Sequence, residues 1–224
     1  MFESSLSDSI SNLAVAFVPV LLGIILHEVA HGWVASRCGD QTARMMGRLT
    51  LNPVPHIDPM GLLMFVITAL FSPFVFGWAK PVPVNPRNMR NPERGMLLVS
   101  LAGPLTNMLL AFICAGGAVF MWNFAQTHIV AEGSALHFLL RMFIVGTVSN
   151  FALAWMNLLP VPPLDGSHLV EAVLPRRLAW QYVRFGRWGM PVLIVLLASG
   201  LLGSVLGPLI TWSSDLSLAF FNLF

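Results

Sequence analysis

Four long apolar stretches, separated by segments that hold nearly all of the charge, constrain this chain of 224 residues more than any other feature. A membrane-spanning helix needs about 20 mainly apolar residues, and each stretch is long enough. Only 10% of the residues are charged and the mean hydropathy is +0.77, whereas soluble domains have about 25% charged residues. The sequence therefore predicts an all-α polytopic membrane protein with four full spans, at about 11–37, 96–122, 136–159 and 190–210.

A fifth apolar segment, residues 60–76, is shorter and is interrupted by Ser72-Pro73. As a helix it would rise only about 25 Å, against a hydrocarbon core of about 30 Å. Basic residues both precede and follow this segment, so a full crossing would put one basic cluster on the wrong side under the positive-inside rule. We expect a re-entrant or interfacial hairpin here rather than a full span.

Two short segments beside this hairpin have the pattern of strands. Arg48-Leu49-Thr50-Leu51 alternates polar and apolar residues, and residues 80–86 read Lys-Pro-Val-Pro-Val-Asn-Pro. The prolines restrict the second segment to a sheet edge or an extended loop. We expect a small β element from these two pieces on the cytoplasmic side.

The distribution of Lys and Arg orients the chain in the bilayer. If both termini face outward, every Lys and Arg except Arg141 lies on the cytoplasmic side. We expect one integral-membrane domain over residues 1–224, with a core of 11–175 and an additional C-terminal span. The net charge of +2 and the lack of a basic, aromatic patch argue against a nucleic-acid partner.

The first apolar stretch contains His27-Glu28-Val29-Ala30-His31, which matches the pattern H-E-x-x-H. Residues i and i+4 of a helix share one face, so the two imidazoles can bind a single metal ion. Glu28 is turned about 100° away, where it can take a proton from a metal-bound water more easily than it can be a ligand. Ionisable groups in a spanning helix are costly and usually mark function, so the pattern predicts a metal site.

A catalytic zinc site needs a third protein ligand and one open position. Asp165 is favoured because it follows a run of prolines that ends an apolar helix and precedes Gly166, which permits a tight turn. The alternative for Asp165 is a helix-end carboxylate in a cytoplasmic turn. The other candidate ligands are Asp58, Glu93, Glu171, His56 and His168.

Three motifs in order make the chain resemble the site-2 protease family of intramembrane zinc metalloproteases. They are HEVAH in the first span, Gly103-x-x-x-Asn107 in a middle span, and NLLPVPPLDG at residues 157–166. The segments LNPVPHIDPMG and GWAKPVPVNP resemble the compact bacterial branch, and the match extends from residue 20 to about 175. We expect no PDZ or CBS domain in this chain, in contrast to better-known members.

The resemblance implies one zinc ion held by His27, His31 and Asp165, with Glu28 as the general base that acts on a zinc-activated water. It also implies an endopeptidase of a bacterial inner membrane, with its active site toward the cytoplasmic side. Its substrates would be membrane proteins cut within or near transmembrane helices, which must unwind locally first. The strand-like segments could pair with an unwound substrate, although simple support of the loop is the favoured interpretation.

Further roles follow from the resemblance and from residue chemistry. Asn157 is predicted to donate to the charge that develops on the scissile carbonyl, and its alternative is to bond backbone carbonyls freed by Pro160. Support of the ligands or positioning of substrate is predicted at Gly103, Asn107, His56 and Asp58. The alternative is helix packing for the two residues in a span and a loop hydrogen bond for the two outside it.

A function of another class uses the same ligands without hydrolysis. The chain could be a metal-ion transporter or a non-catalytic zinc-binding membrane scaffold. A transporter needs no general base, so Glu28 beside the metal ligands favours the enzyme.

Overall fold

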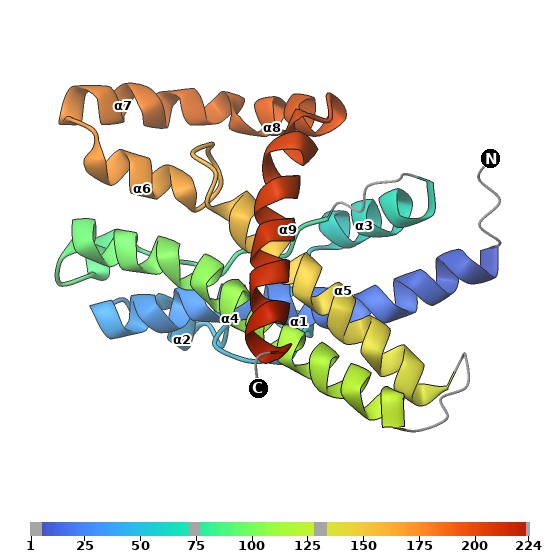
Figure 1. Ribbon diagram of the computed structural model, residues 1–224. Helices are drawn as coiled ribbons and strands as arrows, with labels where there is room; N and C mark the ends of the chain where they lie inside the picture. The colour runs from blue at the N-terminus through green and yellow to red at the C-terminus, as the bar shows by residue number, and fades with distance from the viewer. Residues whose placement is uncertain (1–5, 72–76, 128–133, 223–224) are drawn as a thin grey trace.

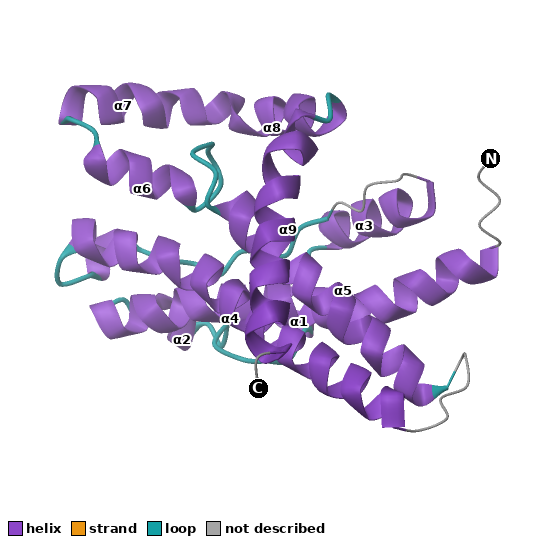
Figure 2. Cartoon of the chain, viewed as in Figure 1, coloured by secondary structure: helices purple, strands orange, loops and turns teal. Residues whose placement is uncertain are grey.

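The computed structural model describes residues 6–71, 77–127 and 134–222. Within these ranges the chain forms helices and no strand (Figure 2). Three helices are long and apolar enough to cross a membrane, and they make this a multi-pass membrane protein. They are α1 (Leu6–Cys38), α4 (Pro92–Thr127) and α5 (Ala135–Asn157).

Further elements connect and follow these three helices (Figure 1). The helices are α2 (Thr42–Met45), α3 (Pro59–Phe71), α6 (Gly166–Val173), α7 (Arg176–Phe185), α8 (Gly189–Ala198) and α9 (Leu201–Asn222). The 3-10 turns are η1 (Val54–His56), η2 (Pro86–Asn88) and η3 (Gly186–Trp188).

Helix α4 packs against both α1 and α5 and joins them into one core (Figure 1). Its buried positions are mostly small residues, which let helix backbones approach closely in lipid. These include Gly95, Gly103, Ala111, Ala115 and Ala118. Large apolar side chains of the same helix are exposed instead, as at Leu98, Leu105, Leu109 and Ile113. This arrangement suits a helix surrounded by acyl chains.

Helix α3 has 13 residues and is therefore about 20 Å long, too short to cross a bilayer. The chain after α3 returns to the place where the helix began. A Cβ atom on Gly61 would overlap the carbonyl group of Trp78, and a Cβ atom on Gly77 would lie 2.8 Å from the Gly61 oxygen. The segment is thus a hairpin and not a full span. The predicted interruption at Ser72-Pro73 lies outside the described residues.

The predicted small β element is wrong. Residues 49–53 form bends and irregular chain, and residues 77–85 form a loop with no ladder partner. The prolines of this loop have no N–H group to donate. Arg48 Nη2 donates instead to the carbonyl oxygens of Lys80 at 2.7 Å and Pro81 at 3.3 Å. A guanidinium group thus holds the loop in the place of a neighbouring strand.

The predicted span over residues 190–210 is also wrong as a continuous helix. The chain bends by 77° between α8 and α9, so these helices form at most one broken fourth span together with α7. The bend falls at Ser199-Gly200, where Gly200 has a φ of +75°. Glycine adopts this left-handed conformation without the strain that a Cβ atom would cause.

Buried Asp40 links the end of α1 to the loop before α4. Its carboxylate accepts hydrogen bonds from the Asn85 N–H at 2.6 Å and from Asn88 Nδ2 at 3.1 Å. It also accepts from the N–H group of Thr42 at 3.1 Å and from the Thr42 hydroxyl. Burial alone would raise the pKa of Asp40, but these hydrogen bonds outweigh it and hold the pKa below its usual value.

We expect Asp40→Asn to lower the free energy of unfolding at neutral pH by about 2 kcal/mol, because a charged acceptor is lost. The folded pKa lies below the unfolded value, so this contribution is present above about pH 4 and is lost as the pH falls through the folded pKa. Unfolding in detergent should therefore show the variant approaching the wild type in acid. Exposed Glu93→Gln is the control, and equal destabilisation by both variants would contradict the role of Asp40.

Candidate metal centre

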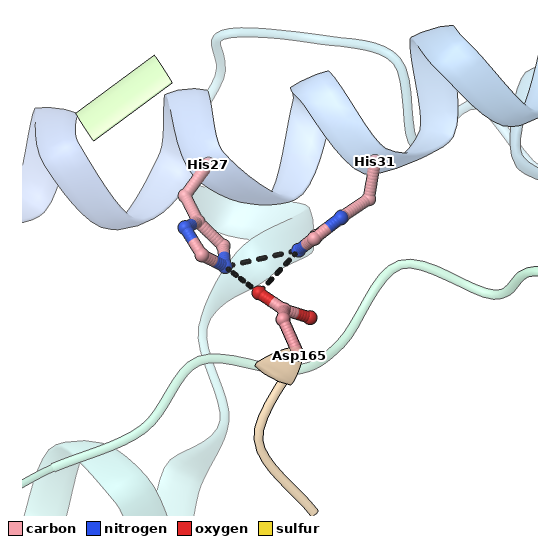
Figure 3. A group of neighbouring side chains, drawn as sticks. All are labelled: His27, His31 and Asp165. Carbon is pink, nitrogen blue, oxygen red and sulfur yellow. Dashed lines mark hydrogen bonds and ion pairs between the residues drawn. The ribbon is translucent and has the colours of Figure 1, made fainter. Parts of the chain in front are cut away.

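Helix α1 and the start of α6 bring three side chains to one point (Figure 3). The ligand atoms of His27, His31 and Asp165 all lie within 4.8 Å of one another. The two Nε2 atoms are 2.9 Å apart, and Asp165 Oδ2 lies 3.2 Å from that of His27 and 3.3 Å from that of His31. The structure thus brings together the three predicted ligands, which are far apart in the sequence.

Hydrogen bonds on the opposite side of each ring determine where the lone pairs point. His31 Nδ1 lies 2.7 Å from the carbonyl oxygen of Val99, which can only accept, so this Nδ1 carries the proton. His27 Nδ1 lies 2.6 Å from Asn107 Oδ1, which is also an acceptor. In the neutral rings both Nε2 atoms are therefore unprotonated, and their lone pairs face each other.

The amide of Asn107 is oriented by acceptors on two other helices. Its Nδ2 donates to the Gly23 carbonyl at 3.2 Å and to Asn150 Oδ1 at 2.9 Å, which leaves Oδ1 for His27. Asn150 Nδ2 donates in turn to the Gly146 carbonyl at 2.9 Å. Sequence reasoning missed Asn150 and Gly23, although an asparagine within an apolar span was a usable signal.

Lone pairs and a carboxylate that face one another repel unless a cation lies among them. Asp165 Oδ2 is buried and has no hydrogen-bond partner among the described residues, as expected of an oxygen that binds a metal. A Cβ atom on Gly103 would lie 2.6 Å from both Nε2 atoms, so α4 keeps this space open by having no side chain there. Two imidazoles and one carboxylate are a donor set of catalytic zinc sites.

A loop that folds back onto the end of α5 positions Asp165. Gly166 lies so close to the carbonyl groups of Leu158 and Leu159 that a Cβ atom would overlap them. Close approach, and not a left-handed turn, is thus the reason for this glycine. Asp165 is the N-cap residue of α6, yet its side chain makes no capping hydrogen bond and faces the histidines instead.

Glu28 turns toward the extended loop between α3 and α4. Its Oε2 accepts a hydrogen bond from the N–H group of Val82 at 2.7 Å. Its other oxygen, Oε1, makes no hydrogen bond with a described residue. The loop that the sequence suggested as a strand therefore holds the carboxylate of the proposed base.

His56 and Asp58 make local hydrogen bonds, and neither bonds to any of the three ligands. His56 Nε2 lies 2.9 Å from the Thr50 carbonyl oxygen, and Asp58 Oδ1 accepts from the Gly61 N–H at 2.8 Å, where it caps α3. These are the bonds of the loop-stabilising alternative.

Asn157 Nδ2 donates to the Leu153 carbonyl of its own helix at 2.9 Å, which fits its backbone-bonding alternative. The predicted role of Asn157 as a donor to substrate would require that bond to break. His168 is partly exposed and lies 3.3 Å from Glu171, away from the three ligands.

The fold and the site together define a candidate zinc centre built among apolar helices. The chain is 35% identical over 205 residues to "Putative zinc metalloprotease YwhC" of Bacillus subtilis (strain 168), covering 92% of this chain and 90% of that protein. It is 31% identical over 219 residues to "Putative zinc metalloprotease Rip2" of Mycobacterium tuberculosis (strain ATCC 25618 / H37Rv), covering 94% and 79%. The model of peptidase family M50 matches residues 123–199. The chain belongs to peptidase family M50, the site-2 proteases.

A more distant relative is "Stage IV sporulation protein FB" of Bacillus subtilis (strain 168), which is 24% identical over 168 residues, covering 74% of this chain and 52% of that protein. No solved structure matches the chain. Family membership makes the protein a zinc metalloendopeptidase, and so favours the enzyme over the transporter or scaffold alternative.

We expect Gly103→Ala to abolish zinc binding while the protein still folds, because the added methyl group would enter the space among the ligand atoms. Zinc content of the purified variant, measured by mass spectrometry, should fall from about one ion per chain to near zero. Gly207→Ala is the control, since a Cβ atom there meets nothing within 4 Å. Full zinc content in the Gly103 variant would contradict this view of the site.

Proposed function

We propose that this protein is an intramembrane endopeptidase that cuts other membrane proteins within or near their transmembrane helices. The observation that carries the proposal is the position of His27 and His31 inside the apolar span Ile10–Cys38. Asn107, the hydrogen-bond partner of His27, lies inside a second such span, and it is fully buried. A site at this depth is accessible to peptide bonds that lie in the bilayer and remote from those of soluble proteins.

In this proposal His27, His31 and Asp165 hold the zinc ion. When bound, the zinc ion acts as a Lewis acid and makes a water molecule acidic enough to lose a proton near neutral pH. Glu28 accepts that proton at Oε1 and later gives it to the leaving amine. The Val82 N–H group binds Oε2 throughout and so keeps the carboxylate in position.

The proposed substrate is a transmembrane helix whose peptide bonds are shielded by its own hydrogen bonds. It must unwind near the cleavage point, and helix-breaking residues there would lower the cost. The active site is proposed to face the cytoplasmic side. Support comes from Arg37 at the end of α1 and from the basic residues that follow, because the positive-inside rule places such clusters in the cytoplasm.

We expect Glu28→Gln to bind zinc normally and to cut at least a hundredfold more slowly than the wild type, because the amide cannot accept the proton. The assay uses vesicles that contain the purified enzyme and a single-span substrate with a Gly-Pro pair in its apolar segment. Products are identified by mass spectrometry. Glu171→Gln is the matched control, and cutting at the wild-type rate by the Glu28 variant would remove Glu28 from this role.

Removal of the third ligand tests the zinc assignment separately. We expect Asp165→Ala to weaken zinc binding by more than a hundredfold, because two imidazoles alone hold zinc poorly. Zinc affinity is measured by competition with a chelator, and His168→Ala, in the helix that follows Asp165, serves as the control. Unchanged stoichiometry and affinity in the Asp165 variant would refute the assignment.

A further inference from the structure

A cavity of about 80 Å³, lined mostly by apolar side chains, lies between α1, α3 and the residues that follow α3. On one side it is bounded by residues of α1, and on the other by residues of α3 and by the chain at 77–79. Among the side chains that line it are Phe17, Leu21, Ile24, Leu62, Phe65 and His56.

Both walls of the cavity lead to the proposed general base. Phe17, Leu21, Ile24 and Glu28 are spaced by four, three and four residues, so they follow one another along a single face of α1. The opposite wall, residues 77–79, continues directly to Val82, whose N–H group binds Glu28. Three residues of extended chain cover about 10 Å, which is the reach of a substrate segment only a few residues long.

His56 gives this cavity one polar contact that the fold does not use. Its side chain lines the cavity and is only 2% exposed. Its Nε2 lies against the Thr50 carbonyl, so that nitrogen is the donor. The remaining nitrogen, Nδ1, is buried and has no hydrogen-bond partner among the described residues. A buried acceptor without a partner is costly, and no described residue supplies the missing donor.

We infer that this cavity is a specificity pocket for one apolar side chain of the unwound substrate, close to the bond that is cut. His56 Nδ1 accepts a hydrogen bond from a backbone N–H group beside that side chain. The inference rests on the proposed function and adds to it which substrate residues the enzyme selects. A lipid acyl chain would fill the cavity but has no donor for His56.

The size of the cavity sets the preferred side chain. A cavity of about 150 Å³ holds benzene, and this one has about half that volume. It therefore favours an aliphatic side chain, such as that of Val or Leu, over an aromatic one. Asp58, the charged group on the wall, is already engaged in capping α3 and leaves the pocket apolar.

Photocrosslinking tests occupancy without requiring proteolysis. The zinc-loaded Glu28→Gln variant is combined in vesicles with the single-span substrate, which carries photo-leucine at one position at a time around its Gly-Pro pair. We expect one position to label Leu62 or Phe65, and its neighbours to label these residues much less. Labelling of these residues only by a diazirine-bearing phospholipid, or by every substrate position equally, would overturn the inference.

Substrate preference provides the second test, through substitutions that change the size of the pocket. At the crosslinked position we expect the wild type to prefer Leu over Ala by about tenfold in kcat/KM. Ile24→Ala should shift the preference toward Phe, and Ile24→Phe should shift it toward Ala. Leu22→Ala is the matched control, because Leu22 is on α1 but does not line the cavity. The same side-chain preference in the wild type, both Ile24 variants and the Leu22 variant would overturn the inference that this cavity selects the substrate side chain.

The contribution of His56 is tested from the substrate side, so that the enzyme remains intact. An ester in place of the amide beside the seated side chain removes its N–H group, and we expect kcat/KM to fall about tenfold or more. Esters two residues away should have little effect, and equal losses at all positions would remove His56 from this role. If the wild type cuts nothing while the crosslink forms, the proposed function fails and the pocket stands.

Discussion

The hydrogen bonds of the two Nδ1 atoms are the interactions on which the rest of this site depends. Val99 and Asn107 on α4 fix the tautomers of His31 and His27, so that both Nε2 lone pairs meet at one point. An imidazole that rotates freely in an apolar bundle would lose this convergence. The packing of α1 on α4 therefore forms the protein core and the metal centre at the same time.

One buried amide connects several polar groups in the middle of this bundle. Asn107 bonds to His27, to the Gly23 carbonyl and to Asn150, so one amide ties α1, α4 and α5 together. In a low-dielectric interior such a network is stable only when its members are satisfied. Asp165 Oδ2 has no such hydrogen bond with a described residue, and it is the atom that faces the paired rings.

At the loop formed by residues 77–85, side chains make the hydrogen bonds that a neighbouring strand would make in a sheet. Arg48 binds carbonyl groups of the loop, Glu28 binds the Val82 N–H group, and Asp40 binds the Asn85 N–H group. The alternating pattern of these segments did not distinguish a strand from a loop held in this way. The proline content pointed to the answer, because a chain that lacks donors cannot form a ladder.

The sequence by itself determined the apolar class of the chain and the shared face of His27 and His31, and it favoured Asp165 as their partner over a carboxylate in a cytoplasmic turn. These follow from short-range rules of hydropathy, helical period and proline chemistry. Only the tertiary structure decided that Asn150 completes the histidine network and that the last helix breaks at Gly200. Both depend on which helices pack together, because the partner of a buried amide and the direction of a chain after a glycine are set by distant neighbours.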